Sequence, residues 1–393
     1  MIPIAKPLLG EEEAEAARAA VLSGWVSQGP QVAAFEAEFA AFVGAEHACA
    51  VSNCTTALHL ALQAVGVGPG DEVVTVSHSF IAGANAIRQC GADPVFVDIE
   101  PDGYNMDPDL IADAITARTR AILCVHQIGM PCDMAAILKV AGRFGLAVVE
   151  DAACGIGSEI HLDGAWQKIG RPMGDIVCFS FHPRKVITTG EGGMLTTNRE
   201  EFDSLFRLWR QHGMSVNDRA RHASATVVFE DYPVRGYNYR MTDIQASIGR
   251  VQLARLPEIV ARRRELADRY TDALAGLDGV VAPREPSWAR SNWQSYCVRL
   301  ADGIEQLDVM QRMLDAGVAT RRGIMNMHQE GAQADLALRF PLPFSEAARD
   351  HCVLLPLYAQ MTNDEQDTVI AGLRSVLGAA PCSDRPRKVR TEA

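Results

Sequence analysis

Hydrophobic positions along the chain follow two different periods from about residue 31 onward. Val32, Phe35, Phe39 and Phe42 recur at spacings of three and four, which predicts a helix that ends at Gly44. Short apolar runs of strand length follow, separated by segments long enough for helices, at residues 47–51, 72–77, 94–99, 120–125 and 146–150. This alternation predicts an α/β fold with a mostly parallel sheet covered by helices on both faces.

Two further strands are predicted at residues 175–181 and 192–197. Their connection of about ten residues is too short for a usual helical crossover between parallel strands. We therefore expect one strand of this pair to run antiparallel to the rest of the sheet.

The second half of the chain predicts a smaller α+β unit. Thr242 and Gln245 have the spacing of a capping box, which opens a helix to about residue 256, and Pro257 is expected to start a second helix. Residues 294–300 read as a strand, and residues 305–316 and a segment opened by Thr362 and Glu365 read as helices. At 393 residues the chain exceeds the roughly 250 to 300 residues at which one core stops growing. We predict a large α/β domain with an N-terminal arm over residues 1–256, a small domain over 257–380 and a disordered tail over 381–393.

Composition excludes several classes of protein. The hydrophobic fraction of 48% and the charged fraction of 22% are typical of a compact globular protein. The net charge of −12 argues against a nucleic-acid partner. The chain has neither an apolar run of membrane-spanning length nor the layout of a signal peptide, so we expect a cytoplasmic protein without a membrane partner. Ten cysteines form no C-x-x-C pair, so we expect buried reduced thiols and no metal site.

Chemistry-bearing residues follow the predicted strands, at the sheet edge where parallel sheets bind ligands. Residues 52–56, Ser-Asn-Cys-Thr-Thr, lead into a helix N-terminus that favours a phosphate, although most such turns are only helix caps. Asp151 ends an apolar strand and could equally cap a loop. Lys185 follows another strand, and burial near cations there would lower the pKa of its amine and expose the nucleophile, although a lone lysine is usually solvated. Together these groups match what pyridoxal phosphate requires.

Nine ordered segments identify a family: SGWVSQGPQVAAFEAEFA, ALHLAL, GVGPGDEVV, SFIAGANAI, GADPVFVDI, EDAA, FSFHPRK, TTGEGGM and GYNYRMTDIQAS. Over roughly residues 3–377 the sequence resembles the DegT/StrS family of sugar aminotransferases, which have the fold-type-I architecture of pyridoxal-phosphate enzymes. The resemblance implies the same cofactor and a homodimer with shared active sites.

The resemblance also implies roles for individual residues. Lys185 would bind the cofactor covalently and then act as acid and base in the proton shift, and Asp151 would pair with the pyridinium nitrogen. Phe80 would stack on the cofactor ring, the alternative being core packing. Four groups would hold the phosphate: the amides of Cys54 and Thr55, the hydroxyl of Ser180, and Asn238 of the opposite subunit. His328 falls where the family has a substrate-contacting histidine, the alternative being a surface loop, and Arg240 and Arg321 are further candidates for binding substrate.

Two features depart from the family pattern. Cys154 stands where the family usually has Gln, His or Glu, so the usual polar contact is not expected there. Residues 160–173 are several residues longer than in common members and add His161, Trp166 and Lys168. This insertion could shape substrate choice, although a surface loop is the simpler interpretation.

The resemblance implies an aminotransferase that moves an amino group from glutamate, or from glutamine, to the ketone of a nucleotide-linked sugar. Because Lys185 is retained, the dehydratase branch of the family, which has histidine there, is disfavoured. The alternatives are an aminocyclitol aminotransferase acting on a keto-inositol and a regulatory protein that binds pyridoxal phosphate without turnover. Five basic residues could hold the diphosphate or be merely solvated: Arg219, Arg221, His222, Arg321 and Arg322.

Overall fold

The computed structural model describes residues 1–216 and 225–378. Its centre is a seven-stranded sheet in the order β1-β9-β8-β5-β4-β2-β3. These strands are β1 (His47–Val51), β2 (Glu72–Val76), β3 (Asp93–Val97), β4 (Thr119–Val125), β5 (Ala147–Asp151), β8 (Ile176–Ser180) and β9 (Gly193–Thr197). Only β9 runs antiparallel to its neighbours in this sheet, which confirms the predicted α/β fold and the predicted reversal of one strand.

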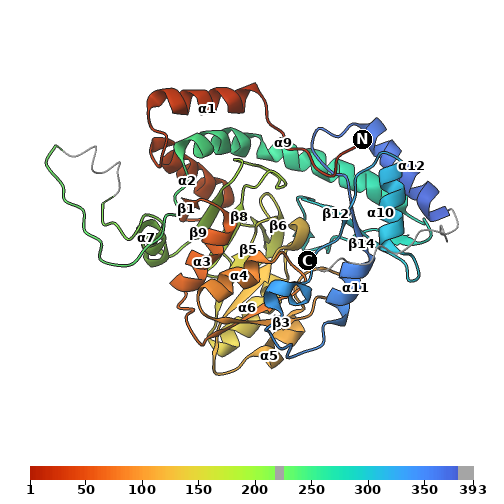
Figure 1. Cartoon of the computed structure of the whole chain (residues 1–393), viewed down its shortest axis with the longest axis horizontal. Helices are drawn as coiled ribbons and strands as arrows, with labels where there is room; N and C mark the ends of the chain where they lie inside the picture. Colours follow the sequence, from red (N-terminus) through yellow and green to blue (C-terminus); the bar gives the residue numbers. More distant parts are fainter. Residues whose placement is uncertain (217–224, 379–393) are drawn as a thin grey trace.

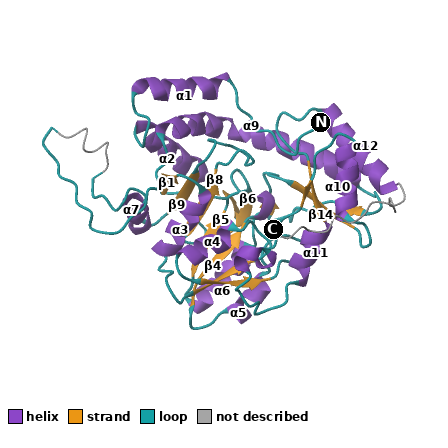
Figure 2. Cartoon of the chain, in the orientation of Figure 1, coloured by secondary structure: helices purple, strands orange, loops and turns teal. Residues whose placement is uncertain are grey.

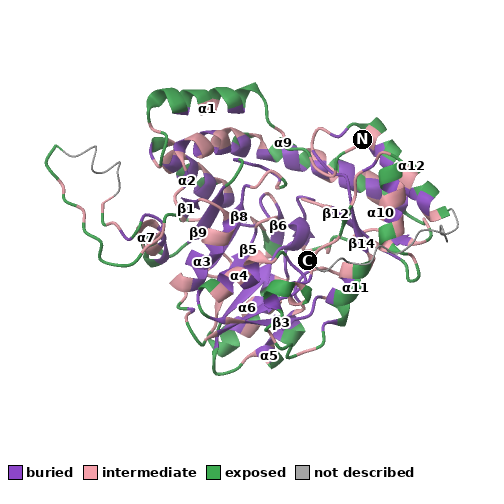
Figure 3. Cartoon of the chain, viewed as in Figure 1, coloured by how far each residue is buried: buried purple, intermediate pink, exposed green. Residues whose placement is uncertain are grey.

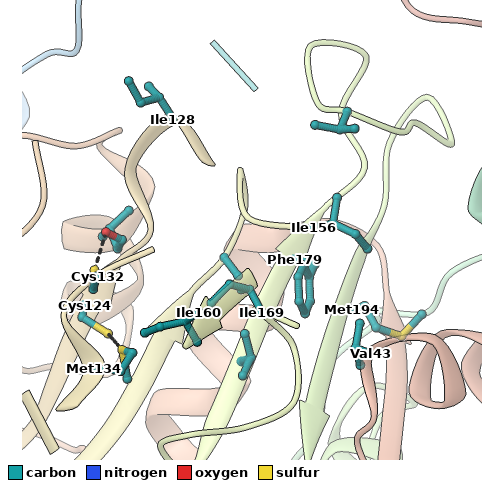
Figure 4. Packing of buried hydrophobic residues seen from close by; sticks show 14 of the residues in the cluster. Val43, Cys124, Ile128, Cys132, Met134, Ile156, Ile160, Ile169, Phe179 and Met194 are labelled. Atoms are coloured by element: carbon teal, nitrogen blue, oxygen red, sulfur yellow. Dashed lines mark hydrogen bonds between the residues drawn. The ribbon is translucent and has the colours of Figure 1, made fainter. Parts of the chain in front are cut away.

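Helices cover both faces of this sheet (Figures 1 and 2). One face carries α3 (Cys54–Ala64), α4 (Ala82–Gln89) and α7 (Glu200–Trp209), and the other carries α2 (Pro30–Val43), α5 (Ile111–Ala114), α6 (Met134–Phe144) and the first half of α9 (Asp243–Leu274). Because successive strand residues point to opposite faces, Val148 packs on the α2 side and Val149 on the α3 side. Figure 4 shows the α2 side, where the Phe179 ring lies near Val43.

Helix α9 corrects one prediction. Thr242 Oγ1 accepts the amide of Gln245 at 3.2 Å and Gln245 Oε1 accepts the amide of Thr242 at 3.0 Å, so the capping box is confirmed. The prediction that Pro257 starts a second helix is wrong, because α9 continues through it to Leu274. An interior proline costs about 3 kcal/mol, but the neighbouring Leu256 and Val260 are buried in the core, and this packing on both sides favours one helix.

The C-terminal part is built on a four-stranded antiparallel sheet in the order β10-β12-β14-β13. Its elements are β10 (Val280–Val281), β12 (Tyr296–Leu300), α10 (Gln306–Asp315), β13 (Arg321–Arg322), α11 (Pro343–His351), β14 (Cys352–Leu355) and α12 (Asn363–Gly378), which confirms the predicted strand and both helices. The second half of α9 packs in the core of this part, so α9 links the two halves (Figure 1). The domain boundary at residue 256 stays a prediction.

The N-terminal residues lie against the C-terminal part. The amide of Ile2 donates to the carbonyl of Gly317 at 2.8 Å, and the amide of Leu357 donates to the carbonyl of Ile4 at 3.3 Å. Helix α1 (Glu11–Ser23) then packs along α9 and exposes most of its surface (Figure 3). The N-terminal arm assigned to the large domain therefore contacts both halves of the chain.

Residues 159–168 form a β-hairpin and not an irregular loop, but the hairpin is exposed around its turn, so the expected surface position is confirmed. Strands β6 (Glu159–Leu162) and β7 (Ala165–Lys168) pair with each other, and β6 also pairs with β11 (Ala289–Arg290). The turn residues Asp163 and Gly164 have φ of 53° and 80°, as a tight hairpin turn requires. The Trp166 ring lies 3.9 Å from the Arg290 guanidinium carbon and 5.4 Å from the His161 ring.

Within residues 1–216 and 225–378, no helix combines the length and the apolar character needed to cross a bilayer. The nine cysteines of this part are free thiols, and all are buried except the partly exposed Cys154. The predicted tail at residues 381–393 lies outside the described residues.

Candidate active site

The carboxyl ends of neighbouring strands bring several predicted residues to one edge of the sheet. Asp151, the last residue of β5, pairs with Cys178 of β8. Ser180, the last residue of β8, pairs with Gly193 of β9, which in turn pairs with Val51 at the end of β1. Asp151, the predicted partner of the pyridinium nitrogen, therefore lies at the same edge as residues 52–56, the predicted phosphate turn.

The phosphate turn opens helix α3. Asn53 caps the helix, since its Oδ1 accepts the amide of Thr56 at 3.0 Å. The amides of Cys54 and Thr55 belong to the first turn, which has no preceding helical carbonyls to accept them. Two N–H groups at the positive end of the helix dipole are thus available to an anion.

Lys185 follows β8 and is half-buried, and the groups that act on its amine are the Asp151 carboxyl and the thiols of Cys154 and Cys54. Its Nζ donates to Sγ of Cys154 at 3.1 Å. Burial by itself lowers the pKa of the amine, but the charges of Cys154, Asp151 and Cys54 outweigh it and raise that pKa above its ordinary value. The expectation that nearby cations would lower this pKa is therefore wrong, because the groups around the amine are thiols and a carboxyl.

Asp151 is buried at the floor of the same site. Its Oδ1 accepts the amide of Ala153 at 2.9 Å, and no described residue donates to Oδ2. Burial raises the pKa of the Asp151 carboxyl, against the opposing effects of the Ala153 amide and of Lys185. A buried carboxylate with one free oxygen gains most from a cationic N–H partner. The preceding Glu150 has a structural role instead, since its Oε1 accepts the amides of Met173 and Gly174.

Phe80 lies in the loop after β2 with 68% of its surface exposed, so the core-packing alternative is wrong. His328 packs against the same loop: its Nδ1 lies 2.6 Å from Oγ of Ser77 and its side chain is only 6% exposed. The surface-loop alternative for His328 is therefore wrong as well. Burial lowers the pKa of its imidazole, and its contact with substrate stays a prediction.

Arg321, the first residue of β13, is exposed. Arg184 directly precedes Lys185. Its pKa is lowered mainly by burial and, to a smaller extent, by the charge of Arg321. The two cations therefore interact electrostatically. Their role in binding substrate stays a prediction, while Arg219, Arg221 and His222 lie outside the described residues.

The segment that carries Asn238 and Arg240 lies beside the phosphate turn of its own chain. The amide of Ser52 donates to the carbonyl of Tyr239 at 2.8 Å, and Arg240 pairs with Val51. This segment is anchored on α3, where the Tyr239 hydroxyl lies 3.2 Å from a ring nitrogen of His59. The action of Asn238 across a dimer and the substrate contact of Arg240 stay predictions.

Sequence reasoning missed three residues that build the site. Arg184 sits next to Lys185, and Gly193 lets β9 approach the phosphate turn. Asn292 is fully buried, and its Nδ2 donates to the carbonyls of Cys154 and Ile156 at 2.7 Å each. The glycine-rich segment was a signal for Gly193, but no local pattern marks Asn292, which lies far away in the chain.

The residues present fit pyridoxal phosphate. A half-buried amine, a buried carboxylate with a free oxygen, an exposed aromatic ring and two free helix amides lie on the strand ends and loops at one edge of the sheet. With the fold-type-I architecture they define a pyridoxal-phosphate-dependent aminotransferase.

The chain belongs to the DegT/DnrJ/EryC1/StrS aminotransferase family, whose model matches residues 7–374. It is 40% identical over 380 residues to the GDP-perosamine synthase of Caulobacter vibrioides, covering 96% of this chain and 98% of the relative. It is 38% identical over 391 residues to the spore coat polysaccharide biosynthesis protein SpsC of Bacillus subtilis, with the same coverage of both chains. Among solved structures it is similar to the aminotransferase TlmJ of Streptoalloteichus hindustanus, with a TM-score of 0.87, 36% identity and coverage of 96% and 99% of the two chains.

Proposed function

We propose that this chain transfers an amino group from glutamate or glutamine to the keto group of a nucleotide-linked sugar. The observation that carries this proposal is the half-buried Lys185 amine, hydrogen-bonded to Cys154 in the turn after β5, together with the buried Asp151 carboxyl that ends β5. A protein that only bound the cofactor would not need this pair, because the phosphate turn and an aromatic ring suffice for binding. The pair therefore supports turnover over the regulatory alternative.

Each residue of the site has a defined task in this proposal. The amides of Cys54 and Thr55 and the hydroxyl of Ser180 hold the phosphate, and the exposed ring of Phe80 fixes the plane of the cofactor ring. When bound, pyridoxal phosphate supplies an electron sink for charge that develops at the amino-bearing carbon. Asp151 keeps the ring nitrogen protonated. Lys185 holds the cofactor and then acts as the acid and base of the proton shift that starts at the amino-bearing carbon.

A sugar linked to a nucleoside diphosphate is the substrate class that these cations fit. The charge of Arg321 lowers the pKa of Arg184, so the two cations act on the same region, and guanidinium groups bind the oxygens of a diphosphate with charge-assisted hydrogen bonds. The 40% identical relative is named a GDP-perosamine synthase, so a GDP-linked keto-sugar is the first substrate to test. Because a charged diphosphate does not cross a bilayer unaided, we place the reaction in the cytoplasm.

The proposal includes a homodimer in which Asn238 reaches the cofactor phosphate of the opposite subunit. On the segment that precedes Asn238, Val227 is 84% exposed and Phe229 is 89% exposed. Large apolar side chains in such positions favour contact with another chain. Their exposure therefore supports an assembly of two chains.

The test is an amination panel read by mass spectrometry. Keto-sugars linked to GDP, to UDP and to dTDP, together with keto-inositols, are incubated with isotope-labelled glutamate or glutamine, and Lys185→Ala is the control. We expect labelled nitrogen in a nucleotide-linked product and none with the variant. Labelled aminocyclitol alone would support the keto-inositol alternative. No conversion of the cofactor to its amine form by either donor would support the regulatory alternative.

A further inference from the structure

Cys154 is held in a fixed position beside the cofactor lysine. It lies in the turn that follows β5, three residues after Asp151. The buried Asn292 donates to the carbonyls of Cys154 and Ile156, and the amide of Gln294 donates to Oδ1 of Asn292 at 2.8 Å. The backbone on both sides of the thiol is thus tied to a distant segment of the chain. Cys154 is also the one described cysteine that is not buried.

Four titratable groups interact electrostatically with the Lys185 amine. Asp151 comes from the end of β5, Cys154 from the turn after it, Cys54 from the start of α3, and His182 from the turn that leads into Lys185. Among the described residues only Cys154 is hydrogen-bonded to Nζ, at 3.1 Å. The nitrogen donates and the sulfur accepts, so this contact favours the ammonium form. It also restricts a flexible side chain to one direction.

We propose that Cys154 is the positioning residue of the cofactor lysine, holding the free Lys185 amine in place and setting the pH range in which it captures pyridoxal phosphate. This inference rests on the proposed role of Lys185. In the capture step, Lys185 first loses a proton to solvent. Its nitrogen then forms a C=N bond with the carbonyl carbon of the cofactor, and the carbonyl oxygen leaves as water. Because only the unprotonated amine has the lone pair for this bond, a sulfur that retains the ammonium shifts capture to higher pH.

The experiment measures the rate of cofactor capture by the cofactor-free protein as a function of pH. The cofactor's visible absorbance is followed in the natural protein, in Cys154→Ala, which lacks the acceptor, and in Cys154→Ser, which keeps one. Cys90→Ala, which removes a buried thiol at the end of α4, is the matched control.

We expect the midpoint of the Cys154→Ala profile to fall by about half to one pH unit, which makes capture near neutral pH about three- to tenfold faster. The profiles of Cys154→Ser and Cys90→Ala are expected to stay close to that of the natural protein. A Cys154→Ala midpoint equal to the natural one overturns the proposal. A slower rate with an unmoved midpoint also overturns it, since that result is what a purely structural turn would give.

Two further measurements separate this inference from the proposed function. If Cys154→Ala does not fold, as judged by circular dichroism, Cys154→Val removes the acceptor and fills the space. Borohydride reduction and peptide mapping then locate the cofactor in each variant. An adduct on Lys185 with an unchanged pH profile defeats only the role of Cys154. An adduct on another lysine defeats the assignment of Lys185 itself.

Discussion

A Cβ atom at Gly193 would lie 2.5 Å from both the carbonyl carbon and the carbonyl oxygen of Asn53. The first residue of β9 is therefore pressed against the turn that opens α3. Real Cβ atoms do not approach backbone atoms this closely, so the contact exists only because residue 193 is glycine. Through it the sheet fixes the position of the two free helix amides proposed to hold the phosphate.

Gly193→Ala is expected to displace this turn. We expect a loss of stability of about 1 to 3 kcal/mol, as for other overpacked sites, and a loss of cofactor affinity of about tenfold or more, because the amides of Cys54 and Thr55 move with the turn. Thermal unfolding and absorbance titration with pyridoxal phosphate measure the two effects. The control is Gly142→Ala on α6, where a Cβ meets nothing within 4 Å. Natural affinity in Gly193→Ala would show that the turn does not bind the phosphate.

Asp151→Asn is expected to separate cofactor binding from catalysis. The amide side chain has the same shape and its oxygen still accepts the Ala153 amide, so we expect the variant to fold and bind the cofactor. A neutral partner cannot hold the ring nitrogen protonated, so transamination should fall by about a hundredfold or more. Single-turnover absorbance with glutamate checks this. Asp133→Asn, which keeps the cap of α6, is the matched control. Near-natural turnover in Asp151→Asn would leave Asp151 as a strand-end cap.

Borohydride reduction of the loaded protein is expected to label Lys185 alone. The competing candidate is Lys168, whose Nζ donates to the carbonyl of Phe42 at 2.8 Å and lies 3.9 Å from the centre of its ring. Those contacts hold it away from the cofactor. Peptide mapping by mass spectrometry distinguishes the two lysines, and Lys185→Ala should lose the label. A label on Lys168 would overturn the site assignment.

The elements that local patterns specify were predictable from the sequence. The capping box of Thr362 and Glu365 forms as expected, with hydrogen bonds of 2.9 and 3.1 Å, because both partners lie within one helical turn. The prediction of a helix start at Pro257 was wrong because the effect of a proline depends on packing. Buried side chains on either side of Pro257 keep α9 continuous.

The site was predictable only in part, because some of its contacts depend on segments that are distant in the chain. Lys185 and Asp151 could be placed because strand ends meet at one edge of a parallel sheet. The contact between Lys185 and Cys154 could not, since it depends on a turn held by Asn292 from a distant segment. Because Cys154 departs from the family pattern, we expected no polar contact at this position. The structure instead has a hydrogen bond from Lys185 Nζ to the sulfur of Cys154.

The last prediction concerns the proposed dimer. If Asn238 holds the phosphate of the opposite subunit, each active site needs Lys185 from one chain and Asn238 from the other. Lys185→Ala and Asn238→Trp homodimers should both be nearly inactive, the second because a bulky ring blocks the phosphate. In a mixed dimer with twofold symmetry, one site receives both lesions and the other receives neither.

Refolding the two variants together in equal amounts should therefore restore activity to about one quarter of the natural value, because half of the dimers are mixed and each has one intact site. Different affinity tags on the two variants allow the mixed dimers to be purified and assayed separately. Each variant refolded alone is the control for recovery. Mixed dimers that form and remain inactive would show that Asn238 acts within its own chain, as the hydrogen bond between the neighbouring Tyr239 and Ser52 also allows. The shared active site would then have to be abandoned.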